Sequence, residues 1–324
     1  MKAIIQNEFG NENVLIYTDI ERPKLESEEI LIKFAYTSVN YADIKKRKGN
    51  KGKGKFPFVP GLDAAGIVEE VFPGSKFSIG ERVIAFPTSG SYAEYGAAHE
   101  SLVYRIPDSL SFEQAAAMPT VSILSSMLLH EIGQVKEADT IVIHSAAGGV
   151  GSMLVQLAKL FGIHQIIGTV GSLEKEDYVK SLGADIVCTY NQFSEEVLAK
   201  TNQQGATVIF DSVAGNITRK SLDCLRLYGT LVQFGNSSGE AGSFTTSDVH
   251  SSCRNIKGFS LGTTRKHQPE RLAPVAARVI DLFASNKVKL PIAKQFDLSN
   301  ASHAHKLMES RNYTGKILLK CSYE

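Results

Sequence analysis

The stretch from Ile141 to Gly151 constrains the fold of this chain more than any other. It reads IVIHSAAGGVG, a β-branched run that ends in a glycine-rich turn, and an apolar helical pattern follows at once. A strand, a tight turn and a helix in this order form a dinucleotide-binding crevice, because glycines let the backbone approach a pyrophosphate and the helix N-terminus offers free N–H groups. Gly148, Gly149 and Val150 are therefore candidate cofactor-binding residues.

The usual fingerprint of this crevice is G-x-G-x-x-G, and Ala146 occupies the place of its first glycine. The interpretation therefore depends on context: a strand before the turn, a helix after it, and further alternation of strands and helices downstream. The alternative is a glycine-rich turn of an α/β fold that binds no nucleotide.

The strand that follows ends in a small turn, Gly171-Ser172, which contains no acidic residue. An NAD site usually places Asp or Glu there for the ribose 2′-hydroxyl, whereas this turn leaves room for a 2′-phosphate. Lys175 can reach such a phosphate as a point charge, and Tyr190 could add a hydroxyl from the neighbouring strand. These residues predict NADPH rather than NADH. Two alternatives stay open: Glu174 as the ribose acid, and Lys175 as an ordinary surface lysine.

The pattern of expected strands and helices changes twice along the chain. Residues 1–118 contain many short strand patterns separated by Pro and Gly, which predict a barrel-like domain. Residues 119–263 alternate between strand and helix patterns, which predicts a doubly wound parallel sheet with a last strand near Ile256–Leu261. Residues 264–324 are expected to complete the first domain, so the overall class is α/β with two domains.

Composition excludes several classes of partner. The 324 residues carry 35 basic and 34 acidic side chains, a net charge of +1, so no strong field favours nucleic acid or an anionic membrane. No apolar run approaches the length of a membrane span. The cysteines are scattered and form no C-x-x-C, which favours buried thiols in a reducing cytoplasm: Cys188, Cys224, Cys253 and Cys321.

Motifs along nearly the whole chain then carry a family resemblance. They follow one another in the family's order: Val39–Asp43, Pro60–Val68, Gly80–Val83, His144–Gly151, Gly168–Gly171, Phe210–Val213 and Phe234–Gly239. In these motifs the chain resembles the zinc-free quinone oxidoreductase (zeta-crystallin-like) branch of the medium-chain dehydrogenase/reductase superfamily. The resemblance implies a GroES-like catalytic domain, a Rossmann-type cofactor domain and a homodimer.

The positions of the catalytic zinc ligands can be compared residue by residue. Zinc alcohol dehydrogenases of this superfamily use the Cys of C-x-x-D and the His of G-H-E-x-x-G. The corresponding places here hold Asn40, with Asp43 retained, and Leu62-Asp63. Asn and Leu cannot replace thiolate and imidazole as zinc ligands, so we expect no metal. Without a Lewis acid, the favoured acceptors are a quinone or the β-carbon of an enone.

The resemblance also implies roles for individual residues. Asn40 would lie near the nicotinamide and the substrate and hydrogen-bond either one, or be a structural turn residue. Tyr41 would face the substrate, where it could supply a proton to an enone, or belong to the core. Lys316 would lie near the cofactor or at the surface. Three residues after another expected strand would lie beneath the nicotinamide ribose: Phe234, Gly235 and Asn236.

Two positions depart from the family pattern. Lys45–Lys48 stand where the family often has an aromatic residue lining the acceptor pocket, and Leu124 stands where it commonly has a threonine. The basic run Lys45–Lys55 is interpreted as a mobile, solvated loop. One alternative is a charged flap that attracts NADPH or an anionic substrate such as an acyl-CoA, and another is a site for single-stranded RNA.

Together these observations predict a cytoplasmic, NADPH-dependent and zinc-independent oxidoreductase that transfers hydride to a quinone. An NADPH-dependent enone, enal or enoyl-thioester reductase is the alternative enzyme. An NADPH-binding protein with a structural or regulatory role is the alternative from another class.

Overall fold

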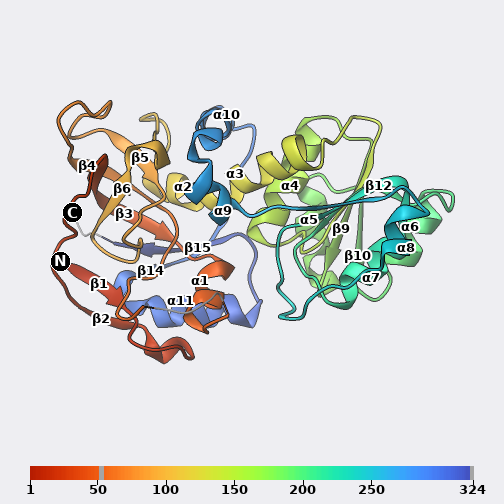
Figure 1. Ribbon diagram of the computed structural model, residues 1–324, viewed down its shortest axis with the longest axis horizontal. Coiled ribbons are helices and arrows are strands. Elements are labelled where there is room, and N and C mark those ends of the chain that lie inside the picture. Colours follow the sequence, from red (N-terminus) through yellow and green to blue (C-terminus); the bar gives the residue numbers. More distant parts are fainter. Residues whose placement is uncertain (51–54, 322–324) are drawn as a thin grey trace. The chain divides into compact units, whose positions relative to one another are not determined.

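The computed structural model describes residues 1–50 and 55–321, and the chain forms two compact units. Unit 1 comprises Met1–Ile123 and Thr263–Glu324, and unit 2 comprises Leu124–Gly262. Helix α3 (Pro119–Met127) starts directly after the domain boundary expected at residue 118, and unit 1 ends inside that helix at Ile123. Figure 1 follows both units along the chain by colour.

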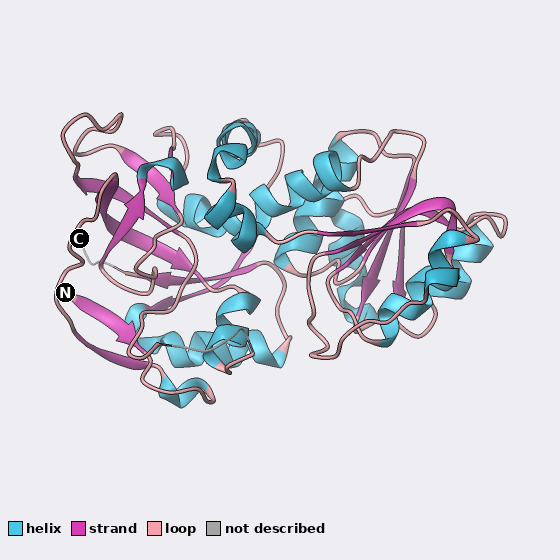
Figure 2. Cartoon of the chain, viewed as in Figure 1, coloured by secondary structure: helices cyan, strands magenta, loops and turns pink. Residues whose placement is uncertain are grey.

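Unit 2 is built on six parallel strands in the order β10-β9-β8-β11-β12-β13. The strands are β8 (Thr140–Ile143), β9 (Gln165–Val170), β10 (Ile186–Thr189), β11 (Ala206–Asp211), β12 (Leu225–Gln233) and β13 (Asn255–Gly258). The helices are α4 (Gly149–Leu160), α5 (Glu176–Ser181), α6 (Phe193–Lys200), α7 (Asn216–Asp223) and α8 (Thr246–His250). Helices cover both faces of the sheet (Figure 2). This strand order is that of a doubly wound dinucleotide-binding sheet, which confirms the predicted fold class.

The central strands of unit 2 are apolar on both faces. Every residue of β11 is buried, as are Ile141–Ile143 of β8, which is the pattern of a parallel strand covered by helices on each side. One hydrophobic cluster joins these strands to α6 and α7 through Phe193, Val197 and Leu222. The sheet is therefore a rigid support for the loops at its carboxyl end.

The expected last strand is wrong in its second half. Strand β13 ends at Gly258, and Leu261 begins helix α9 (Leu261–His267). Residues 256–261 read IKGFSL, and so few apolar positions have no periodicity that separates a strand from the start of a helix, so the pattern joined two elements.

Unit 1 contains a seven-stranded, largely antiparallel sheet and a separate pair, β1 with β2. The larger sheet has the order β14-β15-β3-β4-β5-β7, and β6 pairs with β3. The strands are β1 (Lys2–Ile5), β2 (Ile16–Asp19), β3 (Glu29–Ser38), β4 (Ala64–Glu70), β5 (Arg82–Ala85), β6 (Tyr95–His99), β7 (Val103–Arg105), β14 (Ile292–Asp297) and β15 (Lys316–Lys320). Its helices besides α9 are α1 (Tyr41–Arg47), α2 (Phe112–Ala117), α10 (Leu272–Ala284) and α11 (Ala301–Ser310).

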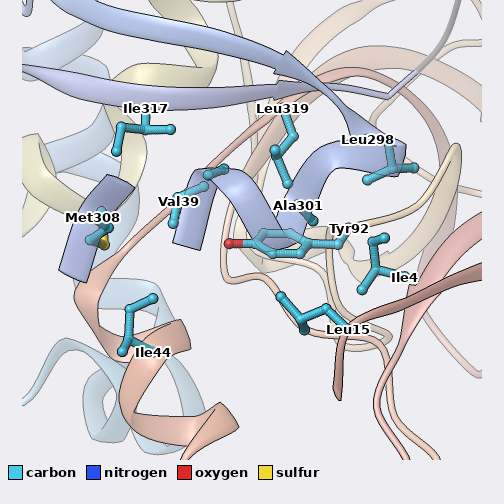
Figure 3. Packing of buried hydrophobic residues seen from close by; sticks show 11 residues of the cluster. Ile4, Leu15, Val39, Ile44, Tyr92, Leu298, Ala301, Met308, Ile317 and Leu319 are labelled. Carbon is cyan, nitrogen blue, oxygen red and sulfur yellow. The ribbon is translucent and has the colours of Figure 1, made fainter. Parts of the chain in front are cut away.

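The last residues of the described chain complete unit 1. Strand β15 pairs antiparallel with β3, and α11 packs its buried face against the same core as α1. Figure 3 shows this core, in which Tyr92 lies among apolar side chains from distant parts of the sequence. Residues near 40 and near 305 are thereby held in one rigid body.

The first part of the basic run is helical rather than the solvated loop that we expected, although Lys46, Lys48 and Lys55 are exposed. Lys45, Lys46 and Arg47 form the last turn of α1, and the Arg47 side chain is fully buried. Lys51 and Lys53 lie outside the described residues. The reason for the burial is a set of polar partners far away in the sequence, described below.

Across residues 1–50 and 55–321, no helix combines the length and the apolar character that crossing a membrane requires.

Candidate functional site

The turn between β8 and α4 has the geometry of a phosphate-binding turn. Gly148 is the N-cap of α4, and no side chain caps the helix, so the N–H groups of its first turn are left for another acceptor. A Cβ at Gly151 would lie 2.2 Å from the Ser145 carbonyl oxygen, which explains why only glycine fits there. Ser145 itself has a positive φ of 55°. Gly148, Gly149 and Val150 thus occupy the predicted position.

The Tyr190 hydroxyl connects the end of β10 to this turn. It accepts a hydrogen bond from the Ser145 N–H at 2.9 Å and lies 3.0 Å from the Ser145 Oγ. The Ser212 hydroxyl donates to the same Oγ at 3.2 Å. Tyr190 was expected to offer its hydroxyl to a 2′-phosphate; in the structure that hydroxyl holds the strained residue of the turn.

The turn after β9 is small and open. A Cβ at Gly171 would meet no atom within 4 Å, and Ser172 caps the following 3-10 helix by accepting from the Glu174 N–H. Lys175 ends that short helix and is the N-cap of α5, half-buried at the carboxyl end of the sheet. Gly171, Ser172 and Lys175 therefore lie on one turn, which has open space at Gly171, and Glu174 lies on the same turn.

Beneath the glycine turn, His144 is fully enclosed. Its Nδ1 lies 2.9 Å from the Thr169 Oγ1, and its Nε2 lies 2.8 Å from the Ser221 Oγ. Burial lowers the pKa of His144 to about 4, against the smaller opposing effect of the Asp211 charge. The imidazole is thus a neutral structural link between the end of β8, strand β9 and helix α7 at ordinary pH.

The loops after β11 and β12 lie side by side. The Phe234 N–H donates to the Asp211 carbonyl at 3.0 Å, and a Cβ at Gly235 would come within 2.8 Å of the Ser212 carbonyl oxygen. The Asn236 Oδ1 accepts from the Gly239 N–H at 2.8 Å. Glycine therefore lets the two loops pass closely at the end of the sheet where doubly wound folds bind ligands.

In unit 1, the amide of Asn40 is held at both ends. Its Nδ2 donates to Asp63 Oδ1 at 3.0 Å and to Ser38 Oγ at 3.2 Å, and its Oδ1 accepts from Lys316 Nζ at 2.8 Å. A carboxylate only accepts and an ammonium only donates, so the partners fix the orientation of the amide. Both amide hydrogens are used inside the unit, so toward another molecule Asn40 could act only through Oδ1, which already accepts from Lys316.

Lys316 is buried rather than at the surface. Besides Asn40, its ammonium donates to the Val39 carbonyl at 3.1 Å. Burial lowers the pKa of Lys316, and the nearby charges of Asp63 and Asp43 raise it. This lysine therefore neutralises the carboxylates beneath Asn40 while holding the Asn40 side chain.

Asp43 extends the network away from Asn40. Its Oδ2 accepts from the Asn40 N–H at 2.8 Å and from the Tyr92 hydroxyl at 3.3 Å. Burial is the main cause that raises the pKa of Asp43 to about 7, while the Asn40 hydrogen bond lowers it and the Asp63 charge raises it. The Oδ1 has no partner among the described residues.

The network then reaches the buried arginine of α1. His305 Nε2 lies 3.0 Å from the Tyr92 hydroxyl, and His305 Nδ1 lies 3.1 Å from Arg47 Nη1. The guanidinium also donates to Glu309 at 2.7 Å. Because Arg is always a donor, Nδ1 accepts and the proton of neutral His305 is on Nε2, pointing toward Tyr92. Sequence reasoning missed this chain of contacts, since its members share no local motif.

Tyr41 follows Asn40 at the first position of α1, and 40% of its surface is exposed. It is therefore not a core aromatic.

The places of the superfamily's zinc ligands hold Asn40, bound as described, and Leu62. Over residues 1–50 and 55–321, no group of three or more His, Cys, Asp or Glu side chains is arranged to hold a metal ion.

Comparisons with known proteins agree with this architecture. Residues 26–108 match the model of the alcohol dehydrogenase GroES-like domain, and residues 149–280 match that of the zinc-binding dehydrogenases. A protein of Schizosaccharomyces pombe named Probable quinone oxidoreductase is 33% identical over 97% of this chain and 95% of its own length. The 2-haloacrylate reductase of a Burkholderia species is 30% identical over 98% of both chains. The crystal structure of Escherichia coli quinone oxidoreductase complexed with NADPH superimposes with a TM-score of 0.93 and 29% identity, covering 99% of this chain and 100% of that one.

Proposed function

Because the chain belongs to the quinone oxidoreductase branch of the medium-chain dehydrogenase/reductase superfamily, we propose that it is an enzyme that reduces a quinone with NADPH. The nicotinamide supplies the hydride when it is bound, so the protein's own task is to bind, orient and stabilise. The single observation that carries the proposal is the glycine turn at the N-terminus of α4, which no side chain caps. The turn that follows β9 has no acidic residue at its first two positions, Gly171 and Ser172.

The residues present fit a phosphorylated dinucleotide. Gly149 and Val150 offer N–H groups to a pyrophosphate, since no side chain competes for them, and Gly148, whose own N–H donates to the Ser145 carbonyl at 2.8 Å, lets the phosphate approach the backbone. Gly171 leaves open space, and Lys175 supplies a positive charge on the same turn. Tyr190 contributes by holding Ser145 in its left-handed conformation. Phe234, Gly235 and Asn236 complete the proposed binding loops at the same end of the sheet.

In unit 1, Asn40 is proposed to act through its amide oxygen. That oxygen keeps one lone pair beyond the Lys316 hydrogen bond, so it can accept from an N–H or O–H group of the cofactor or substrate but cannot donate. Lys316 sets this orientation from beneath and is a positioning residue. Exposed Tyr41 is the proposed proton donor where the acceptor needs one.

Zinc independence is part of the proposal. Its support is chemical: an amide that spends both hydrogens on Asp63 and Ser38, and a leucine side chain, stand where the metal would need a thiolate and an imidazole. A quinone suits such a site, because it accepts hydride without a metal and takes its protons from solvent.

Reduction of an activated carbon–carbon double bond is the second candidate. The similarity to 2-haloacrylate reductase favours it, and so does the exposed Tyr41 phenol, which could protonate the α-carbon. Replacing Tyr41 by Phe should lower kcat for an enone at least tenfold more than kcat for a quinone. Equal effects on both acceptors would remove the role given to Tyr41.

We further propose a cytoplasmic homodimer. Its support is the family membership, the widely scattered cysteines, and the position of β13 as the last strand of its sheet, where a second copy could pair. Light scattering of the purified protein at micromolar concentration tests this, and a monomeric mass would contradict it.

The cofactor assignment is tested by the affinities for NADPH and NADH of wild type and Lys175→Met. Loss of a charged contact to the 2′-phosphate should weaken NADPH binding about 10- to 100-fold and leave NADH binding unchanged. Lys180→Met on α5 is the matched control, because Lys180 pairs with Glu176 at the surface. Equal loss for both cofactors, or tighter binding of NADH by wild type, would favour Glu174 as the ribose acid and overturn the NADPH assignment.

A further inference from the structure

Two cationic side chains of unit 1, Lys46 and Arg265, lie near the Asn40 network without a carboxylate of their own. The Lys46 ammonium lies 4.3 Å from the centre of the Phe58 ring. The Arg265 guanidinium lies 4.8 Å from the centre of the Phe86 ring and donates to the Leu62 carbonyl at 3.2 Å. Neither forms an ion pair within residues 1–50 and 55–321, whereas the neighbouring Arg47 and Lys48 both pair with Glu309.

The two cations are close enough to affect each other. Crowding by protein atoms lowers the pKa of Lys46; the Asp43 charge raises it, and the Arg265 charge lowers it further. Burial likewise lowers the pKa of Arg265, against the attraction of Asp63 and Asp43. Holding two like charges together costs free energy that a bound anion would recover.

The nearby carboxylates do not supply that anion. Asp63 is fully buried and uses Oδ1 on Ser38 and Asn40 and Oδ2 on the Thr120 N–H. Asp43 is enclosed in the Asn40 and Tyr92 contacts. The positive charge of Lys316 already lies close to the two carboxylates, Asp63 and Asp43. Adding Lys46 and Arg265 makes three cations for two acids, so the region has a surplus of positive charge.

The surplus lies beside the residues proposed for the acceptor. Lys46 lies in the last turn of α1, the helix that Asn40 caps and Tyr41 begins, and it is exposed. Arg265 binds the carbonyl of Leu62, the residue that precedes Asp63 of the Asn40 network. Both cations are thus attached to elements that carry the Asn40 network, the helix that Asn40 caps and the chain next to Asp63.

We propose that the acceptor carries a carboxylate, which binds Arg265 and Lys46; this inference rests on the second candidate function, the NADPH-dependent reduction of an activated carbon–carbon double bond. Arg265 offers the planar fork that matches a carboxylate, and Lys46 adds a point charge. In the reaction, the acceptor's activated carbon–carbon double bond gains a hydride at one carbon and a proton from Tyr41 or water at the other. NADPH becomes NADP⁺, and the carboxylate group itself is not altered.

A matched pair of acceptors tests this without any mutation. 3-Benzoylacrylate and its methyl ester have the same reactive double bond and differ in charge. The wild-type enzyme should reduce the acid with a kcat/KM at least tenfold above that of the ester, mainly through KM, and the advantage should shrink as salt rises. A neutral naphthoquinone serves as the reference for NADPH-dependent turnover.

Variants then locate the anion. Lys46→Met and Arg265→Lys should each reduce the acid-to-ester ratio of kcat/KM at least threefold, whatever their effect on naphthoquinone reduction. Lys48→Met is the control on the same helix end, because Lys48 pairs with Glu309, and its ratio should stay unchanged.

Three outcomes would overturn the inference. Equal kcat/KM for acid and ester, with normal naphthoquinone reduction, would refute the carboxylate preference and leave the proposed function intact. A raised KM for NADPH in the two variants, with no change in the acid-to-ester ratio, would assign the cations to a cofactor phosphate. No NADPH oxidation with any of the three acceptors would refute both proposals.

Discussion

Replacing Lys316 by Met removes one buried positive charge and keeps most of the volume of the side chain. The ammonium donates to the Asn40 Oδ1 at 2.8 Å and to the Val39 carbonyl at 3.1 Å, and Lys316 is only 3% exposed. After the change both oxygens lack a donor, and the charge of Asp63 loses its buried counter-ion. Met fills the same space, so the effect is electrostatic rather than a cavity.

The size of the effect follows from these contacts. Each hydrogen bond to a charged group contributes about 1.5–3 kcal/mol, and breaking a buried charge pair by removing one partner costs about 3–5 kcal/mol. The two ranges overlap because they describe the same atoms. We therefore expect a loss of about 4 kcal/mol in the free energy of unfolding of unit 1, which lowers its thermal midpoint by roughly 10 °C.

Thermal unfolding followed by circular dichroism, at pH 7.5 and constant salt, measures this loss. Lys294→Met is the control, because Lys294 lies on the neighbouring strand β14, is exposed, and contacts the Phe296 ring at 5.0 Å. That variant should unfold within about 2 °C of wild type. If Lys316→Met did the same, the ammonium would not neutralise the network, and the fixed orientation of the Asn40 amide would lose its support.

Three further predictions concern unit 2. Tyr190→Phe removes the acceptor of the Ser145 N–H, so it should cost about 1–2 kcal/mol of stability and weaken NADPH binding, measured by titration calorimetry. Gly151→Ala places a Cβ 2.2 Å from a carbonyl oxygen and should abolish cofactor binding, whereas Gly171→Ala, in open space, should leave the fold unchanged; equal behaviour would contradict the turn geometry. His144 has a native pKa of about 4, below its ordinary 6.5. Its contribution to the free energy of unfolding is therefore complete above pH 6.5 and falls by up to about 3 kcal/mol as the pH drops to 4. In His144→Gln this fall, measured by denaturant unfolding at each pH, should be smaller.

Much of the fold could be predicted because short segments of the sequence each specify their own strand, turn or helix. The run from Ile141 to Gly151 contains its own strand, turn and helix, and the structure places Gly148 at the N-cap as the pattern predicts. The alternation downstream fixed the class of the sheet. The end of β13 could not be predicted in this way, since the few apolar residues between Ile256 and Leu261 have no distinguishing period.

The network beneath Asn40 could not be predicted, for a physical reason. A buried arginine looks like any other basic residue until its partners are known, and the partners of Arg47 are His305 and Glu309, over 250 positions away. The family resemblance indicated roles for Asn40 and Lys316, but it did not indicate that the two side chains are in contact. Only the fold shows that the lysine donates to the asparagine amide, which leaves that amide as an acceptor.

The most direct test of the central claim is the steady-state oxidation of NADPH by the purified protein with a quinone, repeated with NADH and with a metal chelator. The account predicts quinone-dependent oxidation that is at least tenfold more efficient with NADPH than with NADH and is unchanged by the chelator. Tight NADPH binding without oxidation by any quinone or enone would contradict it and indicate a non-enzymatic, NADPH-binding role. Loss of activity on chelation would contradict the zinc-independent site built on Asn40 and Leu62.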